Sequence, residues 1–152
     1  MLLGQFGGKL SAKRRMVVPR KLAKELGSPM IIAKWYEGCL VLVSTESWGE
    51  LLKKVRGTGE LITSMIRDVD RFIAGSAFEV EIDELGRIIV PDLLADYAGL
   101  KEDVIFLGLS DRVEIWSQQV WREKEKRIAD QAAVALEKIA HEEKNPRAGN
   151  DS

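Results

Sequence analysis

The 152-residue sequence contains one cysteine, Cys39, and one histidine, His141. A single cysteine excludes an intrachain disulfide and fits a reducing cytoplasm. His141 lies in a charged stretch far from any other motif, and neither residue has neighbours at metal-ligand spacing, so we expect no metal site and no cofactor. A phosphate-binding glycine-rich loop is also lacking, since Gly7 and Gly8 form too short a run. These absences argue against an enzyme and against a small-molecule substrate.

No hydrophobic run approaches the ~20 residues that cross a bilayer, so no membrane partner is expected. The N-terminus lacks the basic and apolar regions of a signal peptide. The net charge is only −1, and 45% hydrophobic with 31% charged residues is ordinary for a globular protein. Because DNA phosphates respond to a local basic patch, the distribution of the cations matters more than their sum.

The sequence does contain a repeat. Residues 10–19 and 82–91 both have an aliphatic residue, four polar or turn-prone positions, an arginine, three apolar residues and a proline. The offset is 72 residues, and Gly27 and Gly99 keep it. A second copy whose later residues stay in step indicates two versions of one module.

Each copy predicts the same ββαββ succession, in which a proline ends the second strand and a glycine ends the short helix. The first strands are predicted at 5–10 and 77–82, the second strands at 16–18 and 88–90, the short helices at 20–26 and 92–98, and the hairpins at 30–35 with 40–43 and at 104–109 with 112–116. Ser44 is a plausible N-cap of the helix that follows the first hairpin. Between the copies, apolar spacing predicts helices at 47–55 and 60–73, and a long helix is expected from residue 121 to 143.

The chain is therefore expected to divide into a first module at 1–56, a linker helix at 57–76, a second module at 77–122, a C-terminal helix at 123–144 and a disordered tail at 145–152. A module of about 70 residues buries little apolar surface alone, so we expect the two to share a core or the chain to oligomerise. The long helix carries an apolar stripe that either lies on the protein or packs against a neighbouring subunit: Ile128, Ala132, Ala135, Leu136 and Ile139.

The sequence contains two Asp-x-x-x-Arg-like turns, an apolar triplet and proline after each arginine, Tyr-Ala-Gly-Leu at 97–100 and Glu-Ile-Trp at 114–116. In these features, over about residues 1–125, it resembles the MraZ family, bacterial transcriptional regulators with tandem SpoVT-AbrB (AbrB/MazE-type) domains. The resemblance implies an α+β, β-rich fold in which tandem swapped-hairpin modules pack as a pseudo-dimeric β-barrel. It also implies homo-oligomeric rings in the cytoplasm, associated with the nucleoid, that bind repeated double-stranded DNA sites upstream of the regulator's own cluster of division and cell wall genes.

The first turn departs from the family pattern. Ser11 and Arg14 stand where the second turn has Asp83 and Gly86. The Ser11 hydroxyl is expected to accept a turn hydrogen bond, more weakly than a carboxylate does. Without glycine, position 14 either needs no positive φ or accepts strain.

The two copies also differ in charge. Residues 9–24 hold seven cations and no acid, whereas residues 79–96 hold one cation, Arg87, and six acids. We therefore expect the first copy to make most DNA contacts and the second mainly to build the assembly. Arg87 is expected to pair with Asp83 across its own turn, which makes this pair a structural element and a weaker DNA candidate.

The predicted DNA contacts are all basic and all in the first copy: Lys9, Lys13, Arg14, Arg15, Arg20 and Lys21. The forked guanidinium groups of Arg14 and Arg15 suit guanine or bidentate phosphate contacts, and the other four suit phosphate. Two other functions stay open at this point. One is an antitoxin-like DNA-binding regulator of the same superfamily, and the other is a ring-forming interaction protein without a direct DNA role.

Overall fold

The structure is a computed structural model that describes residues 1–57, 59 and 61–144. The chain forms two compact units, Met1–Gln118 and Gln119–Ser152, and each is described by itself. The first unit is α+β and β-rich, as expected. The disordered tail predicted at 145–152 lies outside the described residues.

The elements of the two copies appear in the same order. The first copy contains β1 (Leu2–Lys9), β2 (Arg15–Val17), α1 (Arg20–Leu26), β3 (Met30–Lys34) and β4 (Leu40–Ser44). The second contains β5 (Phe78–Val80), β6 (Arg87–Ile89), α4 (Asp92–Tyr97), β7 (Asp103–Ser110) and β8 (Val113–Ser117). Between them lie α2 (Thr45–Arg56) and α3 (Ser64–Phe72), and single 3-10 turns occur at Tyr36–Gly38 and Ala74–Ser76. The predicted ββαββ succession is confirmed in both copies.

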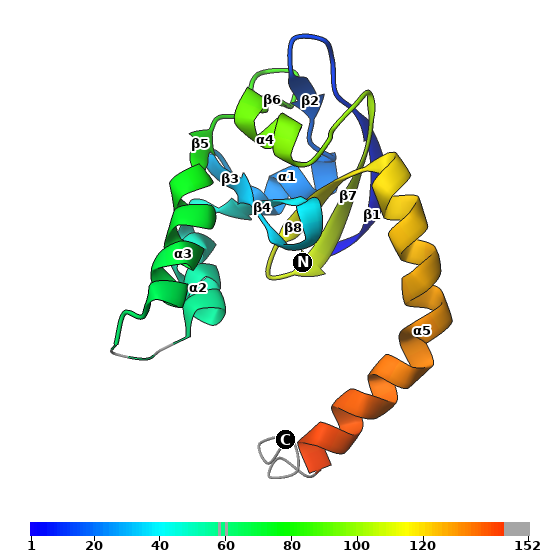
Figure 1. Cartoon of the computed structure of the whole chain (residues 1–152). Helices are drawn as coiled ribbons and strands as arrows, with labels where there is room; N and C mark the ends of the chain where they lie inside the picture. Colours follow the sequence, from blue (N-terminus) through cyan, green and yellow to red (C-terminus); the bar gives the residue numbers. More distant parts are fainter. Residues whose placement is uncertain (58, 60, 145–152) are drawn as a thin grey trace. The chain divides into compact units, whose positions relative to one another are not determined.

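The copies exchange strands in a six-stranded sheet of order β1-β7-β8-β4-β3-β5 (Figure 1). The first strand of each copy pairs antiparallel with the hairpin of the other, β1 with β7 and β5 with β3. At the centre of the sheet β4 pairs with β8, where Leu40 lies opposite Ile115. The order reads the same when the copies are exchanged, so the two modules share one sheet.

A second, two-stranded ribbon contains one strand from each copy, β2 and β6. Met16 lies opposite Ile88 at its centre, and both side chains are fully buried. Because side chains alternate along a strand, Val17 and Ile89 face the opposite way, and they are 53% and 57% exposed. The ribbon therefore has one face in the core and one face in solvent.

The core brings together apolar side chains of both copies. Its fully buried members include Leu22 and Leu94, which occupy equivalent positions on α1 and α4, and Phe106 on β7. The interior is common to the two copies, because a single cluster of buried apolar side chains contains residues of both. This agrees with the expectation that modules of this size share a core.

Local capping sets the helix bounds between the copies. The Ser44 hydroxyl accepts a hydrogen bond from the Ser47 N–H at 3.2 Å, which confirms the predicted N-cap. The helix predicted from residue 60 begins instead at Ser64, because Thr63 is extended and caps the Ile66 N–H at 3.2 Å. The prediction was wrong there because hydrophobic spacing carries no information on where a cap interrupts it.

The second unit is dominated by one helix, α5 (Gln118–Lys144), which begins three residues before the predicted start at residue 121. The apolar stripe residues Ile128, Leu136 and Ile139 are exposed. No helix within the described ranges is long and apolar enough to cross a membrane.

Candidate nucleic-acid interface

The two turns that follow the first strands have the same backbone. In the first, the Arg14 N–H donates to the Ser11 carbonyl at 3.0 Å, and in the second the Gly86 N–H donates to the Asp83 carbonyl at 3.0 Å. Arg14 has φ 62° and Gly86 has φ 78°. Of the two alternatives for position 14, the structure shows the strained one, since an L residue in this left-handed region costs about 1–2 kcal/mol.

The turns differ in how they are closed. The Asp83 carboxylate accepts hydrogen bonds from the N–H groups of Leu85 and Arg87, both at 2.9 Å, and from the Arg87 Nε at 2.8 Å. These bonds, above all that from the Arg87 backbone N–H, hold the pKa of Asp83 below its ordinary value. In the first turn the Ser11 hydroxyl accepts only from the Arg15 N–H, at 3.1 Å.

Because of this difference, one of the two equivalent arginines is paired with a carboxylate and the other is not. Arg87 is held by Asp83, whereas Arg15 makes no ion pair with any residue that the structure describes. Arg15 is half-buried and is the first residue of β2. Because side chains alternate along a strand, it faces the side of the ribbon opposite to the buried Met16. Its guanidinium therefore lies at the solvent face of the ribbon without a carboxylate partner.

Strand exchange places each turn beside the short helix of the other copy. The Val90 N–H donates to the Arg14 carbonyl at 2.8 Å, and the Arg14 Nε lies 3.0 Å from an oxygen of Asp92 on α4. A terminal nitrogen of Arg14 also lies 3.5 Å from Asp96. Arg14 therefore binds the acidic helix of the second copy.

Lys9, at the end of β1, is also held by a carboxylate. Its ammonium group contacts Asp103 at the start of β7. The hydrogen bond to Asp103 raises the pKa of Lys9. Two of the six predicted DNA contacts, Lys9 and Arg14, thus already have anionic partners within the chain.

At the other end of the ribbon, a groove lies between the second turn and α1. This groove of about 830 Å³ separates the turn at 83–86 from α1, and Arg20, Lys24 and Glu84 contribute to its lining. Arg20 and Lys24 are equivalent to Asp92 and Asp96, and Gly86, which has no side chain, is equivalent to Arg14. Within the described part of the chain, no carboxylate forms an ion pair with Arg20, Lys21 or Lys24.

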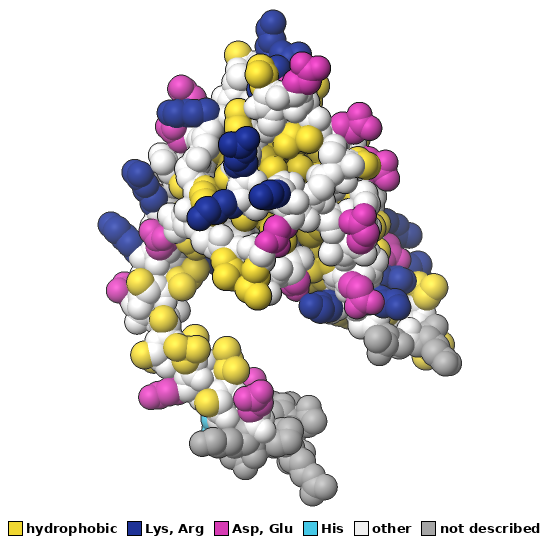
Figure 2. All heavy atoms as spheres, turned by 180° about the vertical axis from the view of Figure 1, so that it is seen from behind, with side chains coloured by type: hydrophobic (Ala, Val, Ile, Leu, Met, Phe, Trp, Pro, Cys, Tyr) yellow, Lys and Arg dark blue, Asp and Glu magenta, His cyan; other side chains and the backbone are white. Residues whose placement is uncertain are grey.

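The charge that surrounds each turn in the structure therefore differs from the charge counted along its own copy of the sequence. The first turn, with Lys13, Arg14 and Arg15, lies beside the acidic helix α4, where Arg14 contacts Asp92 and Asp96. The second turn, with Asp83 and Glu84, lies beside the basic helix α1. Figure 2 shows basic side chains at the tip of this unit with acidic ones directly beside them. The expectation that the first copy makes most DNA contacts stays a prediction, but the charge asymmetry behind it is largely evened out by the exchange.

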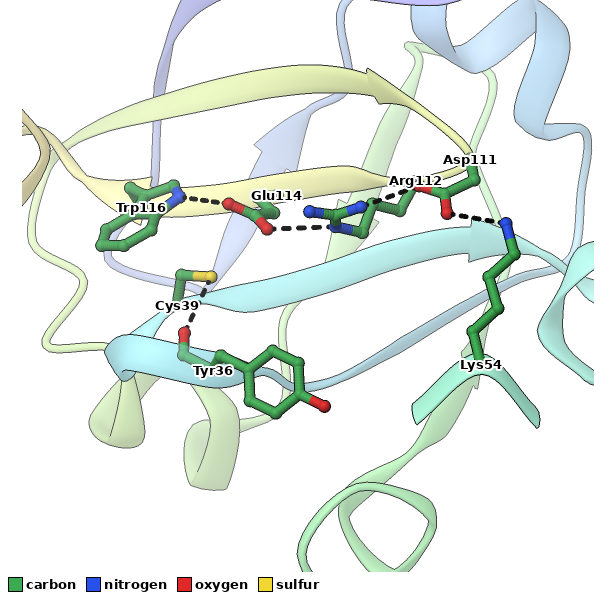
Figure 3. Close-up of polar contacts among 7 residues, drawn as sticks. All are labelled: Tyr36, Cys39, Lys54, Asp111, Arg112, Glu114 and Trp116. Carbon is green, nitrogen blue, oxygen red and sulfur yellow. Dashed lines mark hydrogen bonds and ion pairs between the residues drawn. The ribbon is translucent and has the colours of Figure 1, made fainter. Parts of the chain in front are cut away.

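A separate polar cluster lies on β8 and its neighbours (Figure 3). Glu114 is 8% exposed, and its carboxylate accepts from Arg112 Nε at 3.1 Å and from Trp116 Nε1 at 3.0 Å. Asp111 then connects Arg112, at 2.8 Å, to Lys54 on α2, at 3.2 Å. This chain of charges links the β7–β8 hairpin to α2.

Cys39 lies in the β3–β4 hairpin, directly before Leu40, which pairs with Ile115 of β8, and it is fully buried. Its Sγ donates to the carbonyl oxygen of Tyr36 at 3.3 Å (Figure 3). Burial, and then the negative charge of Glu114, raises the pKa of the thiol far above its usual range. No cluster of three metal-ligating side chains occurs among the described residues.

Comparison with known proteins agrees with this architecture. The family model described as "MraZ protein, putative antitoxin-like" matches residues 73–141. A protein named "Transcriptional regulator MraZ" from Thermoanaerobacter sp. (strain X514) is 39% identical over 140 residues, which are 92% of this chain and 94% of the relative. Its namesakes from Natranaerobius thermophilus and Clostridium botulinum (strain Alaska E43 / Type E3) are each 37% identical, and the matches cover 93% and 80% of this chain and 96% and 84% of the relatives. With relatives this similar over nearly their whole length, the chain belongs to the MraZ family.

Proposed function

We propose that this chain is a non-enzymatic transcriptional regulator that binds double-stranded DNA through the solvent face of the β2–β6 ribbon and the two turns beside it. The observation that carries the proposal is the unpaired guanidinium of Arg15 at that face. A two-stranded β-ribbon is one of the elements that the major groove admits, and arginine is the commonest side chain to read guanine there. The names of the relatives support a role in transcription.

The ribbon gives the candidate residues different roles. Arg15 is suited to a base edge or a bidentate phosphate contact, and Lys13 in the same turn to a phosphate. At the other end of the ribbon, Arg20 and Lys21 are exposed cations suited to the phosphate backbone, and the open groove beside them leaves room for it. Arg87 is a weaker candidate, because it would have to leave Asp83 to bind DNA.

We further propose that several copies assemble as a ring on repeated promoter sites of the division and cell wall gene cluster and act there as a repressor, in the nucleoid of the cytoplasm. Each copy then presents one ribbon, and simultaneous contacts raise the total affinity far above that of one ribbon. The exposed apolar stripe of α5 is a candidate contact between copies.

The description of the matching family model favours a second candidate, an antitoxin-like regulator. Such a protein would use the same DNA surface and would also bind a toxin. Co-purification of one neighbouring gene product with the tagged chain, together with growth arrest when that product is expressed alone, would favour this candidate.

A fluorescence-anisotropy titration tests the DNA contact. The probe is labelled DNA from upstream of the protein's own gene, and each variant is titrated at two salt concentrations. Arg15→Ala is expected to weaken binding about tenfold or more, and Lys13→Ala to weaken it less while lowering the salt slope by about 1. Lys53→Ala is the control, because Lys53 is an exposed cation on α2, away from the ribbon (Figure 1), and should bind as wild type.

Two results would contradict the proposal. If Arg87→Ala abolished binding in a folded protein while Arg15→Ala did not, the assignment of the reading arginine would be wrong. If the wild-type protein showed no preference for this DNA over an unrelated duplex, a ring-forming interaction protein would be the better description.

A further inference from the structure

The first turn lacks the internal anchor of the second. Asp83 closes the second turn with three hydrogen bonds, one of them from the Arg87 side chain. Ser11 closes the first with one hydrogen bond, from the Arg15 backbone. The exchange of aspartate for serine therefore releases Arg15, but it also removes most of the side-chain bonds that would fix the turn.

The first turn has an external anchor instead. Arg14, which replaces the glycine of the second turn, reaches Asp92 at 3.0 Å and Asp96 at 3.5 Å. These acids are four residues apart on α4, so they lie on one face of the helix. The Val90 N–H donates to the Arg14 carbonyl at 2.8 Å, as the Val18 N–H does to the Gly86 carbonyl at 3.0 Å, so the side-chain ion pairs of Arg14 are what distinguishes the first turn.

The two acids on α4 are complementary in charge to the first turn only. Their equivalents on α1 are Arg20 and Lys24, and that helix faces Gly86. An arginine at position 86 would meet two like charges, whereas an arginine at position 14 meets two opposite ones. Side chains at three pairs of equivalent positions thus differ in a mutually consistent way.

We infer that Arg14 is a positioning residue, which fastens the first turn to α4 of the other copy and so replaces the Asp83–Arg87 type of anchor while leaving the Arg15 guanidinium free. The anchoring follows from the geometry alone, and its consequence for DNA rests on the function proposed above. Arg14 then acts on DNA through Arg15 and not by its own contact.

Amide hydrogen exchange of the full-length protein tests the anchor without DNA. Arg14→Gly is the variant to use, because glycine tolerates the left-handed backbone that this position has. Loss of the two exposed ion pairs is expected to speed exchange of the Ser11 and Arg15 amides about three- to tenfold. The double variant Asp92→Asn with Asp96→Asn should do the same, and the Asp83 and Gly86 amides of the second turn are the internal control.

DNA binding separates anchoring from a charge effect. Asp92→Asn with Asp96→Asn removes two negative charges beside the ribbon, so charge alone predicts tighter binding. Anchoring predicts binding about two- to fivefold weaker, because the turn that carries Arg15 loses its order. Adding Ser11→Asp to Arg14→Gly recreates the pattern of the second turn and should restore slow exchange, but not DNA affinity, because Arg15 gains a carboxylate partner.

The inference is overturned if neither Arg14→Gly nor the double asparagine variant changes exchange in the first turn. It is also overturned if the double variant binds DNA more tightly than wild type. Should the wild-type protein fail to bind DNA at all, the proposed function falls, while the exchange measurements still decide whether Arg14 anchors the turn.

Discussion

Arg14 and Gly86 occupy equivalent positions of the two turns, and both have a left-handed backbone. Arg14→Ala and Arg14→Gly remove the same ion pairs, but only glycine relieves the strain of a positive φ. The alanine variant should therefore be the less stable by about 0.5–1 kcal/mol, after the greater unfolded-state entropy of glycine is allowed for. Urea unfolding of the two variants measures this difference, and equal stabilities would show that position 14 carries no strain.

Glu114 is expected to be the most sensitive acid of the first unit. Glu114→Ala removes the buried acceptor shared by Arg112 and Trp116 and should lower the free energy of unfolding by about 2–4 kcal/mol. Glu114→Gln keeps the shape and part of the hydrogen bonding, so its cost should be clearly smaller. Glu50→Ala, an exposed acid on α2, should stay within about 0.5 kcal/mol of wild type. If Glu114→Ala unfolded like Glu50→Ala in urea, the cluster would have no part in stability.

Cys39 is expected to be unreactive in the native protein. Burial keeps its thiol protonated, because the raised pKa leaves almost no thiolate at neutral or mildly alkaline pH. Ellman's reagent should therefore label about one thiol per chain in denaturant and almost none before unfolding. Rapid labelling of the folded protein at pH 8 would show that the β3–β4 hairpin opens easily.

Asp83 is expected to titrate below the ordinary aspartate value of about 3.9. Because its pKa is lowered by folding, the stabilisation it gives is present above the unfolded pKa and is lost as the pH falls through the folded pKa. The main cause is the backbone N–H of Arg87, so Arg87→Gln should raise the pKa only in part. Carboxyl NMR titration of the two proteins checks this, and a full return to the ordinary value in the variant would assign the effect to the guanidinium instead.

Much of the fold was predictable because its signals are local. The proline before each short helix, the cap at Ser44 and the glycine after Leu26 depend on a few adjacent residues, and α1 was predicted with the bounds observed. The start of α3 was not, since Thr63 competes with an apolar period that runs through it. Strand exchange followed from the family resemblance and not from any local pattern.

The candidate site was predictable in its composition but not in its pairing. The replacement of aspartate by Ser11 indicates from sequence that Arg15 lacks a partner in its own turn. The contacts of Arg14 with Asp92 and Asp96 join residues about 80 apart, and the hydrogen bond to Asp96 spans 82. Charge counts along the chain could not show that acids of one copy offset cations of the other. Combined with the strand exchange, the 72-residue offset places the acidic helix of one copy beside the basic turn of the other, and so would have shown that these charges offset one another.

Because strands of the first copy pair with strands of the second, the sheet can be completed only after the second copy has been synthesised. When β4 leaves the ribosome at Ser44, its neighbour β8 is 73 residues from completion at Ser117. At about 5–20 residues per second, the first half of the chain waits roughly 4–15 s for the strands that complete its sheet. During that interval a second nascent chain can offer the same partner strands. Because both copies belong to one polypeptide, the partner strands of the same chain have a higher effective concentration than those of a second chain.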